Sequence, residues 1–389
     1  MKILLFINSL ECGGAERVTA NLANYWAAKG WRVDLVTLEP KTSDFYALHP
    51  GITRRELKLS GGSKNALVGL RQNMRRVIGL RSLLRERAPH VALAMMTTSN
   101  IVLALAAHGL HAVKAVGSER NHPPRIKLGL AWSVLRRFAY CRLAAVVALA
   151  SLSAEWIESN TNARRVTVIP NVASWPLQDI PPNRPVETCC GMDRKILLSV
   201  GRLEHQKGFD VLLDAFAPLA RMHPDWDLVI VGEGSERAAL EATVASANLA
   251  GRVFLPGQVG NIAAWYRRAD LYVLSSRFEG FPNTLAEALA SGVPAVGFNC
   301  DTGPGDIIRH EVDGLLVDAM DIAGMRSALD RLMEFEALRI RYGARALEAR
   351  ERFSQERVVS MWENLFHELL PSVDLAAGVP EAPGMMERG

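Results

Sequence analysis

Two basic residues in the C-terminal half have the type and spacing to bind a phosphorylated ligand. Arg202 and Lys207 stand in "SVGRLEHQKGFDVLLDAF", between Gly201 and Gly208, on the loop between a strand pattern and a helix pattern. Guanidinium and ammonium groups donate charged hydrogen bonds to phosphate oxygens, so this pair can clamp a pyrophosphate. The alternative interpretation, two solvated surface cations, stays open at this point.

Two glutamates bracket the next candidate loop. In "SSRFEGFPNTLAEALASG", residues 275–292, Glu279 and Glu287 flank a turn between a strand pattern and a helix pattern. Thr284 and Glu287 match a capping box, in which the glutamate reaches back to the amide of the first residue. A cap does not account for Glu279, so we expect its removal to cost activity with little loss of stability.

A glycine pair follows the first strand pattern. Gly13 and Gly14 in "INSLECGGAERV" precede a helix pattern, and paired glycines let a backbone approach a ligand closely. A helix N-terminus at the carboxyl end of a parallel strand is a common anion site. Many such turns use glycine for geometry alone, so this signal is weak by itself.

Two other patterns are set aside. Gly232 and Gly234 begin a dinucleotide fingerprint, but Arg237 stands where the third glycine belongs, which argues against nicotinamide binding. Asp225 and Asp227 form a D-x-D pattern without a nearby histidine or third carboxylate, so we expect a solvated strand entrance and predict no metal site.

The elements that position these residues are strands and helices in alternation from end to end. This pattern predicts an α/β fold of two Rossmann-like parallel-sheet domains that face a deep cleft. The expected division is residues 1–172 for the N-terminal domain, 173–194 for a proline-rich linker, 195–353 for the C-terminal domain, 354–370 for a helix that crosses back to the N-terminal domain, and 371–389 for a disordered tail.

Composition excludes several classes of protein. The 389 residues suit two domains, and 49% hydrophobic with 22% charged residues is a globular composition. No stretch reaches the ~18 uninterrupted apolar residues of a membrane span, and the apolar N-terminus fits a buried strand better than a signal peptide. Five cysteines without metal or redox spacing are expected to be reduced thiols in the cytoplasm.

Charge is unevenly distributed along the chain. Residues 64–142 contain fourteen Lys and Arg against two acidic residues, although the whole chain is only +4. The asymmetry indicates an anionic partner, which can be a nucleic acid, a phosphorylated substrate or an anionic bilayer, unless it is only a solvated basic face. A nucleic acid is disfavoured because aromatic residues do not interleave the arginines.

Together these motifs resemble the retaining nucleotide-sugar glycosyltransferases of family 4, with the GT-B fold, over residues 1–370. The motifs occur in order: the glycine pair, "VIPNV", "GRLEHQKG", "VGEG", and E-x7-E from Glu279 to Glu287. The run "EGFPNTLAEALASGVPAVGFNCDTGPGDII" is similar to members that transfer hexose or N-acetylhexosamine, including N-acetylgalactosamine, to polysaccharide or lipid-linked oligosaccharide intermediates.

The resemblance implies a UDP-sugar donor in the C-terminal domain and neither metal nor cofactor. It assigns Arg202 and Lys207 to the diphosphate, Glu287 to the ribose hydroxyls and Glu279 to the donor sugar, with Arg202, Lys207 and Glu279 catalytic. The other implied donor contacts are Gly13, Gly14, Gly257 near the base, and the loop residues Gly280, Phe281, Pro282, Asn283 and Thr284. Cations would stabilise the leaving phosphate, and retention would proceed by same-face attack.

One departure concerns the acceptor side. Many relatives carry a histidine where this chain has Glu119, in "AVGSERNHPP". Glu119, Arg120 and His122 are the candidates for acceptor contact on this loop. Arg120 can also contact a phosphate, and His122 is either catalytic or a solvated loop histidine. Arg71 and Arg75, in the basic helix pattern 65–88, are expected to meet the phosphates of a glycan or polyprenyl-diphosphate acceptor at the anionic inner face of the cytoplasmic membrane.

Two rival functions remain. A sugar-nucleotide epimerase or a phosphorylase shares this kind of fold, although no lysine cofactor site supports the phosphorylase. A basic nucleic-acid-binding protein is the rival from another class.

Overall fold

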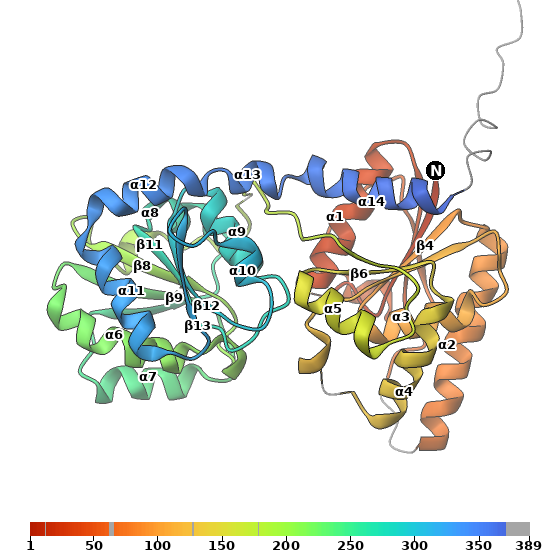
Figure 1. Cartoon of the computed structure of the whole chain (residues 1–389), viewed down its shortest axis with the longest axis horizontal. Coiled ribbons are helices and arrows are strands. Elements are labelled where there is room, and N and C mark those ends of the chain that lie inside the picture. The colour runs from red at the N-terminus through yellow and green to blue at the C-terminus, as the bar shows by residue number, and fades with distance from the viewer. Residues whose placement is uncertain (12, 62–65, 127, 178, 371–389) are drawn as a thin grey trace, which may run out of the picture.

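Two α/β domains lie side by side in the computed structural model (Figure 1), which describes residues 1–11, 13–61, 66–126, 128–177 and 179–370. The N-terminal domain is built on a parallel sheet in the order β3-β2-β1-β4-β5-β6-β7. Its strands are β1 (Lys2–Ile7), β2 (Arg32–Thr37), β3 (Thr53–Glu56), β4 (Val91–Met95), β5 (Lys114–Ser118), β6 (Ala145–Ala148) and β7 (Val166–Val168).

The C-terminal domain is built on a second parallel sheet, in the order β10-β9-β8-β11-β12-β13. Its strands are β8 (Lys195–Val200), β9 (Trp226–Val231), β10 (Val253–Gly257), β11 (Leu271–Leu274), β12 (Ala295–Asn299) and β13 (Gly314–Asp318). In both sheets the strand order reverses beside the first strand, and ligands of open α/β sheets bind at such switch points. The predicted pair of Rossmann-like domains is confirmed.

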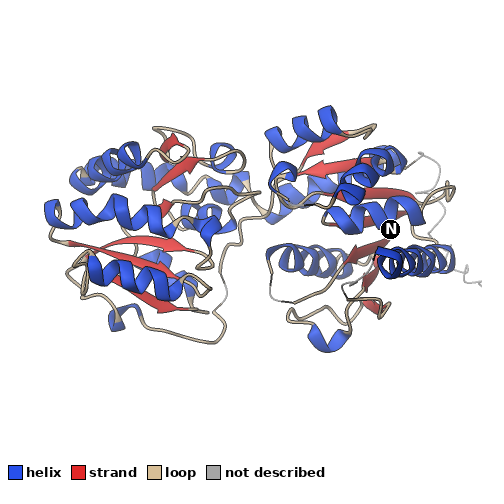
Figure 2. Cartoon of the chain, turned by 90° about the horizontal axis from the view of Figure 1, so that it is seen from below, coloured by secondary structure: helices blue, strands red, loops and turns tan. Residues whose placement is uncertain are grey.

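Helices cover both faces of each sheet (Figure 2). In the N-terminal domain they are α1 (Gly14–Ala28), α2 (Ala66–Arg87), α3 (Thr97–Ala106), α4 (Leu130–Ala139) and α5 (Ser151–Asn160). The others are α6 (Phe209–Met222), α7 (Arg237–Ser246), α8 (Ile262–Arg268), α9 (Asn283–Ala290), α10 (Pro304–Ile307), α11 (Ile322–Glu334), α12 (Glu336–Ala346), α13 (Ala349–Arg352) and α14 (Gln355–Leu369).

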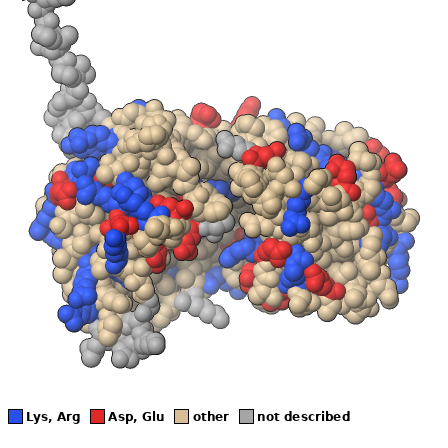
Figure 3. Space-filling view, turned by 180° about the vertical axis from the view of Figure 1, so that it is seen from behind, with Lys and Arg blue, Asp and Glu red and all other residues tan. Residues whose placement is uncertain are grey.

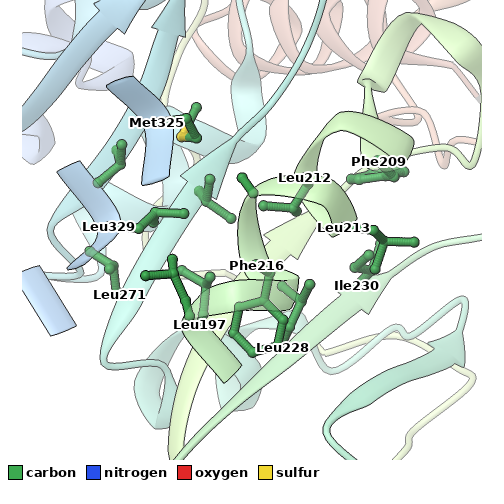
Figure 4. Close-up of a cluster of buried hydrophobic side chains, with 14 of the residues drawn as sticks. Leu197, Phe209, Leu212, Leu213, Phe216, Leu228, Ile230, Leu271, Met325 and Leu329 are labelled. Carbon is green, nitrogen blue, oxygen red and sulfur yellow. The ribbon is translucent and has the colours of Figure 1, made fainter. Parts of the chain in front are cut away.

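Apolar strands hold the sheets between these helices. In the C-terminal domain, Leu197 and Leu228 of the sheet pack against Phe216 of α6 and Leu329 of α11 (Figure 4). Strands buried on both faces read as continuous apolar runs, which explains sequences such as "KILLSV" and "WDLVIV". This core fixes the strand ends from which the site loops leave.

The C-terminal helix α14 returns to the N-terminal domain (Figure 1). Its Trp362 and Phe366 are buried in the same core as Trp26 of α1, with the Trp26 and Phe366 ring centroids 5.5 Å apart. The chain passes between the domains twice, near residues 173 and 353. These two segments are in contact, because the Ala173 amide donates to the Phe353 carbonyl at 2.9 Å. The expected disorder of the tail 371–389 lies outside the described residues.

The D-x-D pattern needs a correction. Asp225 is half exposed and pairs with Lys195, but Asp227 is buried between Arg194 and Arg252, at 2.5 and 3.0 Å. The expectation of two solvated carboxylates is therefore wrong for Asp227, because two arginines from neighbouring segments neutralise it inside the domain.

Other expectations concern metals, membranes and thiols. Across the described residues, no group of three or more His, Cys, Asp or Glu is arranged to hold a metal, and no helix is long and apolar enough to cross a membrane. The four cysteines within the described ranges are free thiols.

Candidate active site

A cavity of about 1230 Å³ lies between the two domains. The N-terminal domain contributes Arg17 and Tyr46, and the C-terminal domain contributes Arg202 from the end of β8, Thr284 and Glu287 from α9. The space-filling view shows the hollow between the two domains (Figure 3). The carboxyl ends of the strands therefore meet the first turn of α1 across one cleft.

A second cavity of about 670 Å³ adjoins Arg202 from the other side. It is lined by Pro124 and Arg125 of the N-terminal domain and by His205 and Phe278 of the C-terminal domain, together with Arg202. Arg202 is exposed and makes no ion pair within the described part of the chain. Its guanidinium is thus available to an anion that enters from either cavity.

Lys207 and Glu279 form an ion pair beside the cleft. Lys207 Nζ lies 2.6 Å from Glu279 Oε1, and the two side chains are only 16% and 6% exposed. Ser276 Oγ donates to the same Oε1 at 2.6 Å, so Oε2 can accept from a further donor. Lys207 passes over Gly201, where an added Cβ would lie 3.3 Å from the lysine methylenes. The structure therefore brings together two residues that the sequence places 72 positions apart.

A glycine makes the loop after β8 possible. Gly208 has φ of +64°, and a Cβ there would lie 2.2 Å from the Ser275 carbonyl oxygen. The left-handed backbone and the close approach both require glycine. Gly208 thus lets the Lys207 loop pack against the loop that carries Glu279.

The capping box predicted for Thr284 and Glu287 is wrong. Helix α9 begins one residue earlier, at Asn283, with Pro282 before it and no side-chain cap. Thr284 Oγ1 instead accepts a hydrogen bond from Tyr272 at 2.9 Å. Proline has no side-chain acceptor, and Glu287 is engaged elsewhere.

Glu287 contacts the opposite domain. Its Oε1 accepts from Nη2 of Arg17 at 2.8 Å, and Tyr266 of α8 donates to its Oε2 at 3.4 Å. Burial raises the pKa of Glu287 above its usual value, while the nearby Arg17 guanidinium opposes that rise. The sequence analysis missed Arg17, although its place in the first turn of α1, three residues after Gly14, puts it at the cleft.

The loop from Gly280 to Asn283 joins the two domains. A Cβ on Gly280 would lie 2.7 Å from the Arg120 carbonyl oxygen, so the two backbones touch there. Asn283 Oδ1 accepts from Asn171 Nδ2 at 2.9 Å. Phe281, by contrast, is buried in the C-terminal core against Phe353, with ring centroids 5.5 Å apart. Its side chain therefore supports the loop and does not face the cleft.

The predicted glycines lie at the rim of the cleft. Gly13 is held by Tyr46, whose hydroxyl donates to its carbonyl at 2.9 Å, and a Cβ on Gly14 would lie 3.8 Å from Asn283 Nδ2. Gly257 ends β10 with φ of +86° and leads into residues 258–260, which line the cleft. None of the three glycines lines either cavity, so their predicted contact with the donor stays a prediction.

Glu119 does not lie on an acceptor surface. It is 1% exposed, lines neither cavity, and accepts hydrogen bonds from Thr97 at 2.6 Å and from Tyr140. Burial raises the pKa of Glu119, and burial together with the neighbouring Glu119 raises the pKa of Tyr140 well above its usual value. The expected acceptor contact is corrected: the carboxylate turns into the domain interior, where its hydrogen bonds are satisfied.

Arg120 and His122 are both buried at the seam between the domains. Arg120 Nη1 donates to Ser118 Oγ at 3.3 Å and Nη2 to Asn171, and no carboxylate among the described residues pairs with it. Burial lowers the pKa of Arg120 to about 10. His122 contacts Ser153 Oγ at 3.0 Å, and burial lowers its pKa, so it is not a solvated loop histidine.

Arg71 and Arg75 are exposed on α2 and line neither cavity. They stand among exposed apolar side chains, of which Leu70, Met74 and Ile78 repeat at helical spacing on the same element. Lys and Arg side chains gather over the N-terminal domain at the left of Figure 3, with a few acidic side chains among them.

Two family models match the chain. The model for glycosyl transferases group 1 matches residues 190–349, and the glycosyl transferase 4-like domain matches residues 13–172. The two matches cover the two domains that form the cleft.

Many curated proteins are similar to this chain, among them the following three. Exopolysaccharide phosphotransferase SCO2592 of Streptomyces coelicolor is 34% identical over 72% of this chain, which spans only 29% of that protein. The amylovoran biosynthesis glycosyltransferase AmsD of Erwinia amylovora is 25% identical over 94% of this chain and 99% of its own length. An undecaprenol-linked glycan α-1,4-N-acetyl-D-galactosaminyltransferase of Campylobacter jejuni is 27% identical over 95% of this chain and 99% of its own length.

Solved structures share the fold at low identity. Sucrose-phosphate synthase from Thermosynechococcus elongatus has a TM-score of 0.76 at 20% identity, over 95% of this chain and 99% of that one. HepE of Anabaena in complex with UDP has a TM-score of 0.75 at 18% identity, over 95% of this chain and all of the other. With both domains matched, the chain belongs to the family 4 glycosyltransferases of the GT-B fold.

Proposed function

We propose that this protein is a retaining, metal-independent glycosyltransferase that moves a hexose or N-acetylhexosamine, with N-acetylgalactosamine favoured, from a UDP-sugar to a lipid-linked or polysaccharide acceptor. The observation that carries the proposal is the cleft between the domains, where Arg202 and Glu287 line one cavity and the Lys207–Glu279 pair lies beside it. The names of the amylovoran and undecaprenol-linked relatives support the acceptor class.

The donor would lie along the cleft with its base at residues 258–260 and its diphosphate near Arg202. The base would lie against residues 258–260, the ribose hydroxyls would donate to Glu287, and the diphosphate would lie between Arg202 and the N-terminus of α9. The first amides of a helix have no intrahelical acceptor, and they favour an anion. Cleavage of the sugar–phosphate bond leaves negative charge on the phosphate, and these fixed donors stabilise that charge best in the transition state.

Glu279 would orient the donor sugar. Lys207 and Ser276 both bind its Oε1, which fixes the carboxylate while Oε2 accepts from a sugar hydroxyl. The departing phosphate oxygen would take the proton of the acceptor hydroxyl on the same face, which retains the configuration at the anomeric carbon. Neither step requires a metal, because Arg202 and Lys207 already supply positive charge.

The acceptor would approach from the N-terminal domain. Arg120 is a buried cation without a carboxylate partner among the described residues, and such a charge is costly unless an anion completes it. A phosphate of the acceptor or of the donor would supply that anion. Arg120 reaches the cleft wall through Asn171 and Asn283, which are themselves hydrogen-bonded.

Helices α2 and α4 would contact the membrane that holds a lipid-linked acceptor. Exposed apolar side chains repeat on α4 at Leu130, Val134 and Phe138, and Arg71 and Arg75 stand on α2. Both helices pack against α3. Apolar side chains beside cations suit the interface of an anionic bilayer, so we place the protein peripherally on the inner face of the cytoplasmic membrane, without a nucleic-acid partner.

The test is donor binding and transfer by Arg202→Ala. We expect UDP affinity, measured by calorimetry, to fall, and transfer from a panel of UDP-sugars to fall on the order of 10²-fold. Arg267→Ala is the matched control, because Arg267 is an exposed arginine of α8 that lines neither cavity. Mass analysis of the products identifies the sugar. Unchanged UDP affinity in Arg202→Ala contradicts the donor assignment.

A further inference from the structure

The Glu287 carboxylate, which we assign to the ribose, forms an ion pair with an arginine of the opposite domain. Glu287 belongs to α9 in the C-terminal domain, and the guanidinium that neutralises it, Arg17, belongs to α1 in the N-terminal domain. The Glu287 side chain is 4% exposed, whereas that of Arg17 is 35% exposed and lines the cleft. A ligand in the cleft would therefore meet Arg17 and Glu287 together.

We propose that Arg17 is a positioning residue for the donor nucleotide: it reaches across the cleft and holds the Glu287 carboxylate charged and oriented for the ribose hydroxyls. The nucleotide site is then complete only while the two domains are in contact. This inference rests on the proposed function, in which Glu287 binds the ribose of a UDP-sugar.

Among the described residues, Arg17 is the basic side chain that pairs with Glu287, and no second ion pair of this carboxylate is found. Its Oε2 faces the Tyr266 hydroxyl, and Tyr272 of β11 is buried close by. Burial disfavours a carboxylate, and neutral hydroxyls offset that cost less than a guanidinium does. The basic side chains on the helices that pack against α9 have other partners: Arg350 and Arg352 of α13 donate to the Ala290 and Ile307 carbonyls at 2.7 and 2.9 Å, and on α12 Arg339 donates to the Leu332 carbonyl, Arg341 lies over Tyr342 and Arg345 pairs with Glu348. The acidic side chains on these helices are Asp306, Glu336 and Glu351.

Hydrogen bonding explains why the charge matters. An ionised carboxylate accepts from both ribose hydroxyls, whereas a protonated one turns an oxygen into a donor. Without Arg17, the pKa of Glu287 would rise further, because the desolvation that raises it would be unopposed. The binding that needs the carboxylate is present above that pKa and is lost as the pH falls through it.

The orientation of Arg17 is fixed by its own helix. Its amide donates to the Gly13 carbonyl at 3.0 Å in the first turn of α1, and Tyr46 binds the same carbonyl. The glycine pair thereby acquires a second use: it starts the helix at the point from which Arg17 can reach Glu287. Nucleotide binding and contact between the domains are then reciprocally coupled.

The test is UDP binding by calorimetry between pH 6 and 8.5 for the parent, Arg17→Met, Arg17→Lys and Glu287→Gln, with Arg267→Met as the control. We expect Arg17→Met to bind UDP roughly 10-fold more weakly near neutral pH, as is typical of coupled sites. Its affinity should recover as the pH rises, with a midpoint at higher pH than that of the parent, and Arg17→Lys should restore most of the affinity.

A double variant separates this role from a direct contact with the nucleotide. If Arg17 acts through Glu287, Arg17→Met should cost little further affinity in a Glu287→Gln background. Additive losses, or a loss without a shift of the pH midpoint, would overturn the positioning role. If UDP binding is intact in Glu287→Gln, the ribose assignment itself fails; if only Arg17→Met is silent, the inference fails and the proposed function stands. Thermal melting confirms that each variant is folded.

Discussion

Glu279→Ala tests whether Glu279 serves folding as well as catalysis, because its carboxylate pairs with Lys207 inside the protein. The sequence analysis predicted little loss of stability when Glu279 is removed, but the side chain forms a mostly buried ion pair with Lys207 at 2.6 Å. Removing the Glu279 carboxylate leaves the mostly buried ammonium group of Lys207 without an ion-pair partner. We therefore expect Glu279→Ala to lose both transfer activity and stability.

The size of the loss follows from burial. Removing one partner of a buried ion pair costs about 3–5 kcal/mol, and we take the lower end, roughly 3 kcal/mol, because Lys207 keeps some exposure. At about 2–4 °C per kcal/mol for a domain of this size, the melting temperature should fall by roughly 6–12 °C. Glu241→Ala is a control, because its ion pair with Arg237 is exposed and should contribute about 0–1 kcal/mol.

A double variant completes the experiment. Glu279→Gln with Lys207→Met removes both charges and keeps an acceptor for Ser276, so its melting temperature should return close to that of the parent. Transfer from the UDP-sugar should stay down by on the order of 10²-fold. Thermal melting and a transfer assay on the same samples decide the matter. A Glu279→Ala protein that melts with the parent refutes the burial argument, and a double variant that regains transfer refutes the catalytic role.

Three further perturbations have defined outcomes. Burial raises the folded pKa of Glu119, so its contribution to stability is lost as the pH rises through that pKa; Glu119→Gln should be the more stable protein in urea at pH 8 and should lose this advantage at acidic pH. Gly208→Ala should destabilise by roughly 1–3 kcal/mol or more in thermal melts, since its φ is +64° and its Cβ would meet the Ser275 carbonyl. Val134→Gln with Phe138→Gln on α4 should abolish flotation with anionic vesicles and leave UDP affinity unchanged; retained flotation would contradict the membrane-facing role of α4.

The hydrophobic periodicity of the sequence was enough to predict the fold. The strands are apolar because helices cover them on both faces, so runs such as "KILLFI" and "KILLSV" mark the starts of two parallel sheets. Strand ends in turn mark the site, because ligands bind there in open α/β sheets. This is why the loops with Arg202, Lys207 and Glu279 could be selected from the sequence alone.

Ion-pair partners that lie far apart in the sequence could not be predicted from strand ends. The pattern around Thr284 satisfies a capping box, yet Glu287 is drawn to Arg17, which is 270 residues away. The sequence pattern predicted that Asp227 would be a solvated residue before a strand, but Arg194 and Arg252 pair with it inside the domain. In each case a charge left in the interior is costly, so a distant opposite charge decides where the side chain points.

The contacts between the two domains differ in kind from those within them. Helix α14 is fastened to the N-terminal domain by buried aromatic packing around Trp362. Across the cleft, the closest side-chain contacts are polar: Arg17 with Glu287, Asn171 with Asn283, and Arg125 with Asp301 at 2.6 Å. Polar contacts exchange for water at little net free energy, whereas buried aromatic side chains do not. A nucleotide bound as proposed would therefore strengthen the contact between the domains chiefly through Arg17, which lines the ligand cavity and pairs with Glu287.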